Sequence, residues 1–89
     1  MGTTWKVKTN NTKVNKAKAY GLCVFAEREI LLSTKWNKLP VARDITEATF
    51  YHELVHAMLE MIGRDDLNQD EQFVDNMGNL LHQFDKTRQ

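Results

Sequence analysis

The chain has 89 residues, of which 42% are hydrophobic and 9% aromatic, and its 12 basic and 12 acidic side chains give a formal net charge of zero. This length supports one small core and excludes a second, so we predict a single domain over residues 1–89. No run of 18 apolar residues occurs, which excludes a transmembrane helix. The single cysteine, Cys23, excludes an internal disulfide and a cysteine-rich zinc ribbon. A bound metal would therefore need histidine and carboxylate ligands.

The net charge of zero hides an asymmetry along the chain. Residues 1–43 carry nine Lys or Arg and two Glu, whereas residues 44–89 carry three Lys or Arg and ten Asp or Glu. A basic half is compatible with a nucleic-acid surface, but two halves of so short a chain must pack together, and we expect much of the field to cancel. Residues 1–9 contain no apolar signal segment, and we expect a cytoplasmic protein that does not bind membranes.

The N-terminal part of the chain has the hydrophobic pattern of strands. Residues 5–9 alternate apolar and basic side chains, and residues 20–26 and 30–34 are rich in aromatic and branched apolar residues. The segment between the last two is short enough for a hairpin connection. Residues 10–19 are polar and rich in lysine, and we interpret them as a mobile loop. The sequence thus predicts three strands.

The C-terminal part has the pattern of two helices. Asp44 followed by Glu47 resembles a capping box for a helix that runs to about Ile62, where Gly63 ends it. Apolar residues on two faces predict that this helix is mostly buried. Asn68 and Glu71 repeat the capping pattern for a second helix that runs to about Phe84. We therefore predict an α+β domain in which a small three-stranded sheet packs on two antiparallel helices. The apolar residues expected to face the core from the second helix are Phe73, Met77, Leu80, Leu81 and Phe84.

The first helix contains the sequence His52-Glu53-Leu54-Val55-His56, which carries the chemistry. A spacing of four residues places both imidazoles on one side of a helix, one turn apart, so both can bind one Zn²⁺ ion. Glu53 follows the first ligand, and from there it can accept a proton from a water that the metal activates. Without a metal, the two histidines would be core residues that need buried partners.

A catalytic zinc site has three protein ligands and one open position. Glu71 is the preferred third ligand, because a short turn after Gly63 can fold its helix back beside the first; its alternative role is only that of a cap partner for Asn68. Asp65 and Asp66 are the other candidates for the third ligand. Asp75 lies one turn after Glu71, and we expect it to accept the second ring N–H of His52. Gly78 continues the same face and would let the two helices approach closely.

This arrangement resembles the gluzincin metallopeptidases, especially the minimal ImmA/IrrE-like and phage-encoded members. The resemblance covers residues 20–84 and rests on the His-Glu-x-x-His motif followed by Glu71 and Asp75. It implies a zincin-like fold, a phage or bacterial source and hydrolysis of peptide bonds, with one zinc ion on His52, His56 and Glu71 and with Glu53 as general base and acid. It also implies that an extended peptide pairs with a strand edge, either residues 20–26 or residues 30–34.

The chain departs from the larger gluzincins in lacking their C-terminal subdomain and a clear oxyanion-stabilising residue. Tyr20 is our candidate for that contact. We interpret His82 as a surface or partner-facing histidine, Cys23 as a small buried hydrophobe, and Trp5 and Trp36 as packing anchors. The residues are compatible with two functions. One is a zinc metallopeptidase acting on a peptide or protein, and the other is a non-catalytic zinc-stabilised module that binds a protein or nucleic-acid partner. A further role for the basic residues, in recruiting the domain to a larger assembly, also remains open.

Overall fold

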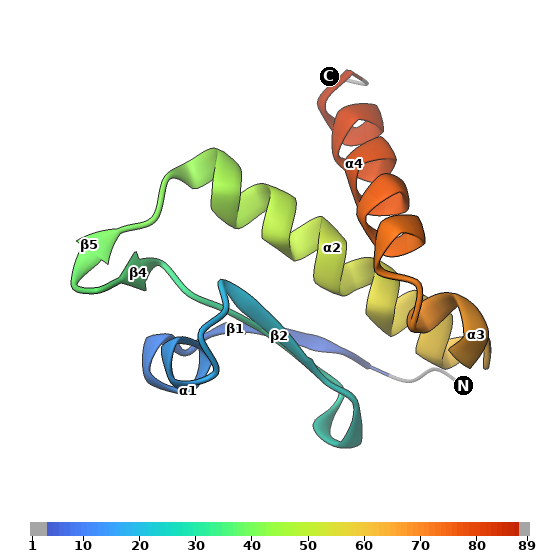
Figure 1. Ribbon diagram of the computed structural model, residues 1–89, viewed down its shortest axis with the longest axis horizontal. Coiled ribbons are helices and arrows are strands. Elements are labelled where there is room, and N and C mark those ends of the chain that lie inside the picture. The colour runs from blue at the N-terminus through green and yellow to red at the C-terminus, as the bar shows by residue number, and fades with distance from the viewer. Residues whose placement is uncertain (1–3, 88–89) are drawn as a thin grey trace.

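A three-stranded mixed sheet forms the N-terminal part of the computed structural model, which describes residues 4–87 (Figure 1). The strands are β1 (Lys6–Thr9), β2 (Gly21–Val24) and β3 (Glu29–Leu32), in the order β1-β3-β2. β3 is parallel to β1 and antiparallel to β2, so that Ile30 is the partner of both Val7 and Cys23. The predicted α+β class and the three predicted strands are confirmed. β1 and β2 are the two edges of this sheet.

A short helix, α1 (Asn11–Lys16), occupies the segment that we expected to be a loop. Asn10 caps it, because its side-chain oxygen accepts a hydrogen bond from the Lys13 backbone N–H at 3.0 Å. Val14 has no exposed surface and anchors the helix in the core. The loop prediction was wrong because one buried valine, rather than a repeating apolar pattern, holds this helix in place.

A second, two-stranded sheet was not predicted at all. It consists of β4 (Lys35–Trp36) and β5 (Leu39–Pro40), which are antiparallel. The two residues between them, Asn37 and Lys38, have positive φ angles of 51° and 65°. This left-handed pair matches the twist of a tight two-residue hairpin. The predicted count of three strands is therefore too low by this hairpin.

The long helix α2 (Arg43–Met61) carries the histidine motif. Its ends agree with the prediction to within one residue, but Ala42 rather than Asp44 occupies the N-cap position, and no side chain caps the helix there. Asp44 lies inside the first turn and accepts from the Ile45 N–H at 3.0 Å. At the other end Gly63 has a φ of 72°, the left-handed conformation that commonly follows a helix.

The second predicted helix is divided into two. α3 (Asp65–Asn68) is a single turn, and α4 (Glu71–Thr87) follows it. Asp70 caps α4 by accepting from the Phe73 N–H at 3.1 Å. Asn68 therefore ends α3 and is not the cap that the sequence suggested, and its side chain is available for another contact.

The helices and the sheet form layers in the order sheet, α2, α4 (Figure 1). α2 packs against β2 and β3 on one side, and α4 packs against α2 on the other, whereas we expected the sheet to pack on both helices. Val55, Leu59 and Val74 form the core between the helices. No helix within residues 4–87 is long and apolar enough to cross a bilayer.

Several apolar side chains that we placed in the core are exposed instead. Leu80 and Phe84 on α4 are 60% and 67% exposed, because this half of α4 has α2 as a neighbour on only one side. The expectation that α2 is buried on most sides was wrong at its C-terminal end, where Met61 and Ile62 are 53% and 69% exposed.

Candidate metal centre

Two imidazoles project from the middle of α2 toward α4. His52 and His56 are one helical turn apart, and their ring centroids lie 5.0 Å from each other. Their side chains are 26% and 15% exposed, so a small ion can reach them while most of each ring is covered. This is the placement that the spacing predicted.

Glu71, the first residue of α4, faces both rings. Its Oε1 lies 3.4 Å from His52 Nε2, and its Oε2 lies 3.6 Å from His56 Nε2. The three side chains can each present one ligand atom within 4.8 Å of the others. Ligands placed about 2.0–2.1 Å from a tetrahedral zinc ion are separated by about 3.4 Å. The donor types and the two distances from Glu71 to the rings therefore fit a zinc ion held by His52, His56 and Glu71.

The other nitrogen of each ring is engaged by a side chain that can only accept there. Asp75 Oδ1 lies 2.8 Å from His52 Nδ1, which is the contact we predicted. The carbonyl oxygen of Asn68 pairs in the same way with His56 Nδ1. Both Nδ1 atoms must donate, since a carboxylate and an amide oxygen only accept. Each neutral ring therefore keeps a lone pair on Nε2, directed toward Glu71.

Asn68 is the functional residue that sequence reasoning missed. Its side-chain oxygen accepts from His56 Nδ1, and its amide nitrogen donates to the His56 backbone carbonyl at 3.3 Å. Two contacts with the same residue hold both the ring and the adjacent turn of α2. The signal was present as an asparagine in the turn before Glu71, but the capping pattern offered a more common explanation.

Glu53 lies behind the histidines, against the sheet. It is only 9% exposed, and burial raises the pKa of its carboxyl, as does the negative charge of Glu71, while the two histidines oppose the shift. Gly21 on β2 makes room for it: a Cβ at Gly21 would lie 3.3 Å from Glu53 Cγ and 2.5 Å from Thr49 Cγ2. The sheet thus approaches α2 closely enough to bury the candidate base.

A cleft of about 480 Å³ opens over these residues. Its wall is formed by the edge strand β2 and by Phe25, which begins the single 3-10 turn (Phe25–Glu27) that connects β2 to β3. β3 is the central strand, so the alternative in which residues 30–34 form the substrate edge was wrong. The cleft brings the candidate metal ligands, Glu53 and a free strand edge into one space.

At Gly78 the backbone of α4 lies close to the backbone of α2. A Cβ added to it would lie 3.2 Å from both the Cα and the N of His52. These are backbone atoms of a helix, which cannot move aside as a flexible side chain can. The close approach that we expected from this glycine is confirmed, and it brings Asp75 to His52.

The alternative third ligands lie elsewhere. Asp66 pairs with Arg64 at 2.8 Å, and Asp65 lines the cleft but is not part of the three-residue cluster. The alternative role of Glu71, as a cap partner for Asn68, was wrong because Asp70 caps α4. Tyr20 lines a neighbouring cavity of about 290 Å³ that also reaches His52 and Glu53, but not the larger cleft. Its assignment to the oxyanion stays a prediction.

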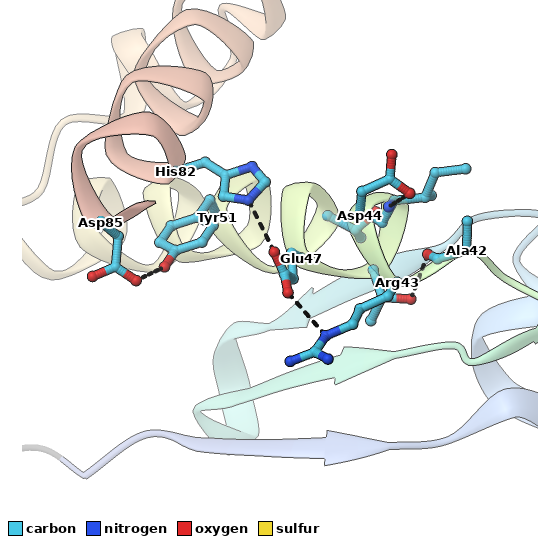
Figure 2. Close-up of polar contacts among 10 residues, drawn as sticks. Ala42, Arg43, Asp44, Glu47, Tyr51, His82 and Asp85 are labelled. Atoms are coloured by element: carbon cyan, nitrogen blue, oxygen red, sulfur yellow. Dashed lines mark hydrogen bonds and ion pairs between the residues drawn. The ribbon is translucent and has the colours of Figure 1, made fainter. Parts of the chain in front are cut away.

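His82 does not behave as a surface histidine. Figure 2 shows its ring beside Tyr51 and its Nε2 directed at Glu47. The rings of His82 and Tyr51 stack at a centroid distance of 5.0 Å, and His82 Nε2 lies 3.2 Å from Glu47 Oε1. Tyr51 donates to Asp85, and Arg43 donates to Glu47 at 3.2 Å. This polar cluster joins the N-terminal half of α2 to the C-terminal half of α4, so the surface interpretation was wrong.

The remaining single residues pack largely as expected. Trp5 contacts Phe25 edge-to-face at 6.4 Å, and Trp36 contacts Tyr20 at 5.5 Å. Cys23 is half-buried rather than fully buried and lines the cleft. Burial, with smaller contributions from Glu53 and Glu60, raises the pKa of the Cys23 thiol to about 12. The thiol is therefore neutral and poorly suited to act as a nucleophile.

Comparison with protein-family models, with curated proteins and with solved structures finds no match to this chain. The resemblance to gluzincins therefore depends on the motif residues themselves. The zincin-like fold and the peptidase activity that it implies remain predictions.

Proposed function

We propose that this chain is a zinc-dependent metallopeptidase in which His52, His56 and Glu71 hold one zinc ion. The observation that carries the proposal is the convergence of these three ligands with Glu53 in one cleft beside a free strand edge. A merely structural zinc site uses four protein ligands and has no need of an adjacent carboxylate. Here three ligands and a buried glutamate are grouped, which is the composition of a hydrolytic site.

The bound ion would supply Lewis acidity, which makes a water proton easier to remove and a carbonyl carbon more electrophilic. Glu53 takes a proton from the attacking water, whose oxygen forms a bond to the carbonyl carbon. The C–N bond then breaks, and Glu53 returns the proton to the departing amine. Asp75 and Asn68 keep the two imidazoles in the orientation and tautomer that this arrangement requires.

The substrate in this proposal is a peptide in an extended conformation. β2 is an edge strand of the three-stranded sheet, and its residues line the cleft that contains Glu53. An extended peptide can therefore pair with the backbone of β2 and pass the metal ligands. Pairing through the backbone sets the position of the scissile bond without requiring a particular side chain.

The experiment compares wild-type protein with Glu53→Gln after zinc loading. Both proteins are analysed for bound zinc and incubated with a mixture of unstructured peptides, whose cleavage is followed by mass spectrometry. We expect equal zinc content and loss of cleavage in the variant by at least about 100-fold, since general acid–base catalysis contributes 10²–10⁴-fold. Glu60→Gln is the matched control, because Glu60 lies two turns further along α2 and does not line this cleft.

One observation favours the second candidate, a zinc-stabilised binding module without turnover. Tyr20 does not line the cleft, so the site has no tyrosine positioned there for the oxyanion. Wild-type protein that binds one zinc ion tightly and cleaves no peptide in the mixture would support the module and contradict the peptidase.

A further inference from the structure

Five lysines gather at the end of the molecule formed by α1, the turn that follows it and the β4–β5 hairpin; we call this surface the basic end. All five are exposed, and none has an ion pair within residues 4–87. Segments 4–26 and 30–43, from which this end is built, contain no Asp or Glu. These segments therefore supply no acidic partner of their own. The lysines are Lys13, Lys16, Lys18, Lys35 and Lys38.

The basic end is separated from the acidic part of the molecule. In Figure 1 α1 and the β4–β5 hairpin lie at one end, and α3 lies at the other. Asp65, Asp66, Asp70 and Glu71 all lie on or next to α3. Packing of the two halves, which we expected to cancel much of their field, leaves these two groups of charges at opposite ends of the molecule. A separation of this kind produces a positive potential that attracts polyanions.

A hydrogen-bond network fixes α1 to the hairpin. Asn11 Oδ1 accepts from the Thr34 N–H at 2.7 Å, and Ser33 Oγ lies 3.2 Å from Asn11 Oδ1 and 3.0 Å from Asn15 Oδ1, so its one proton can bond to either asparagine. Ser33 is 1% exposed, so its hydroxyl is shielded from water, whereas the bond between Asn11 and Thr34 lies at the surface. The lysines of α1 and those of the hairpin are consequently attached to one rigid base, and binding requires little ordering of the backbone.

The turns of the basic end carry lysines in a backbone conformation that disfavours them. Lys18, Asn37 and Lys38 have φ angles of 58°, 51° and 65°. This left-handed region costs a non-glycine residue about 1–2 kcal/mol, and glycine would occupy it freely. Strain of this kind concentrates at ligand-binding segments, where the side chain is needed. In each of the two turns, one of the residues in this conformation is a lysine, Lys18 in the first and Lys38 in the second.

An aromatic pair borders these lysines. Tyr20 is 42% exposed, and its ring lies 5.5 Å from that of Trp36 at an interplanar angle of 51°. Unpaired bases stack on exposed aromatic rings, whereas the bases of a duplex are stacked on each other and cannot. An acidic protein would complement the lysines but has no comparable use for the rings.

From the unpaired lysines, the strained turns and the adjacent rings, we propose that the basic end binds single-stranded nucleic acid. Lys13, Lys16 and Lys18 contact phosphates on one side, Lys35 and Lys38 contact them on the other, and Tyr20 stacks on a base. The interaction does not depend on zinc, and it leaves open whether the cleft hydrolyses peptides.

The test is fluorescence anisotropy with labelled oligo-dT and oligo-rU of about 12 nucleotides, a length within the range that such surfaces cover. We expect log K to fall with log[NaCl] between about 50 and 200 mM with a slope on the order of −3, since each neutralised phosphate of a single strand contributes about −0.7. The double variant Lys13→Gln, Lys16→Gln should make the slope less steep by about 1.4. Lys86→Gln, an exposed change on α4, is the control and should leave the slope unchanged.

Tyr20 provides a second, independent readout. Tyr20→Ser should weaken binding by roughly 10-fold without changing the salt slope, because base stacking contributes about 1–3 kcal/mol and involves no counterion. Tyr20→Phe should restore it. Absence of binding at about 50 mM NaCl would overturn the proposal. Equal binding of a duplex of the same charge, of heparin or of phosphatidylserine vesicles would overturn it as well, in favour of a general polyanion or membrane surface.

Discussion

At the scale of single residues, the two candidate histidine ligands differ in their supporting partners. His52 is held by the carboxylate of Asp75, and His56 by the amide of Asn68. A carboxylate that accepts from Nδ1 increases the basicity of the ring more than a neutral amide does. The orientation of the candidate ligand His56 therefore depends on its hydrogen bonds with a neutral amide, without the added effect of a carboxylate charge.

We predict that Asn68→Ala weakens zinc affinity by about 10–100-fold, because removing such a partner releases the ring of His56. Asn68→Asp should retain the affinity or increase it, since a carboxylate oxygen replaces the amide oxygen. Competition with a chromophoric zinc chelator measures both. Gln72→Ala, an exposed change in the first turn of α4 that does not line the cleft, is the control. Equal affinities in wild type and Asn68→Ala would show that the amide does not support the ligand.

Cys23 permits a test that is independent of any metal. Its pKa of about 12 leaves only about one thiol in ten thousand ionised at pH 8, whereas an unperturbed cysteine is substantially ionised there. We predict that a disulfide reagent such as Ellman's reagent reacts with metal-free folded protein at least about 100-fold more slowly than with the same protein in urea. Similar rates in the two states would mean that the thiol is neither buried nor shifted.

Single residues also show what sequence reasoning can and cannot reach. The spacing of His52 and His56 determines their relation within one helix, and the short turn after Gly63 was sufficient to place Glu71 nearby. Asn68 could not be assigned, because the same residue type caps helices and orients histidines. Only the position of Asp70, which caps α4 itself, decides between the two roles.

At the scale of elements, the crossing of α2 and α4 at Gly78 determines the geometry of the centre. Gly78→Ala places a methyl group 3.2 Å from backbone atoms of His52, so α4 must shift away and carry Glu71 and Asp75 with it. We predict a fall in zinc affinity of roughly 10-fold or more, comparable to the loss of a ligand-supporting contact. The change in stability should be small, because a strain of about 1–3 kcal/mol opposes the gain of about 1 kcal/mol in helix propensity.

The control for Gly78→Ala is Asn76→Ala, at an exposed position of the same helix. It gains helix propensity without approaching α2, so the protein should become slightly more stable and bind zinc as before. If both variants bound zinc equally well, the helix crossing would not control the site.

The polar cluster around His82 makes the contact between these helices sensitive to acid. The hydrogen bond with His82 lowers the pKa of Glu47, with a further contribution from Arg43 (Figure 2). A carboxylate with a lowered pKa stabilises the fold above its ordinary pKa of 4.5, and this stabilisation is lost as the pH falls through the folded value. Its pH window is therefore acidic and does not extend to neutral pH.

We predict that Glu47→Gln lowers the free energy of unfolding at about pH 6. At about pH 3 the difference from wild type should be smaller. Urea unfolding of both proteins at the two pH values measures this. Asp44→Asn, an exposed change on the same helix, serves as the control. Its difference in stability from wild type should not change with pH to a comparable extent. A difference that stayed constant on acidification would exclude Glu47 as a contributor.

The elements that the sequence predicted are those with a long or strongly apolar pattern. α4 has a clear helical period, α2 is apolar on two faces and has signals at its ends, and the strands of the larger sheet are alternating or apolar, so all of them could be located. α1 and the β4–β5 hairpin were missed because long-range contacts stabilise them. Val14 is buried by the rest of the chain, and the Ser33 hydroxyl lies within hydrogen-bond distance of both asparagines of α1. A six-residue helix with one buried apolar residue and strands of two residues have too little local pattern to be recognised alone.

At the scale of the whole molecule, the two proposed activities lie at different ends. The candidate zinc site lies between α2 and the α3–α4 turn, and the basic end lies at α1 and the hairpin (Figure 1). The described chain is small, with a Cα radius of gyration of 13.1 Å, so a strand bound at one end would lie near the cleft at the other. A peptide substrate that itself binds nucleic acid would be brought to the cleft at raised local concentration.

Zinc binding should also be visible in the stability of the whole chain. The three ligands come from α2 and α4, which the ion would link across the helix crossing. A ligand that binds only the folded state stabilises it by about 2.7 kcal/mol at a free concentration of 100 Kd. For a domain of this size, that corresponds to a rise in Tm of roughly 10–20 °C.

We therefore predict a rise in Tm of this order on adding zinc to chelator-treated wild type, measured by calorimetry or circular dichroism. His52→Ala and His56→Ala should lose the rise, because neither leaves three ligands, whereas Glu53→Gln should keep it in full. This pattern distinguishes metal binding from hydrolysis, since Glu53→Gln removes only the proposed base. If zinc left the Tm of wild type unchanged at concentrations far above those of the protein, the three side chains would be an ordinary polar contact between helices, and the metallopeptidase proposal would fail with them.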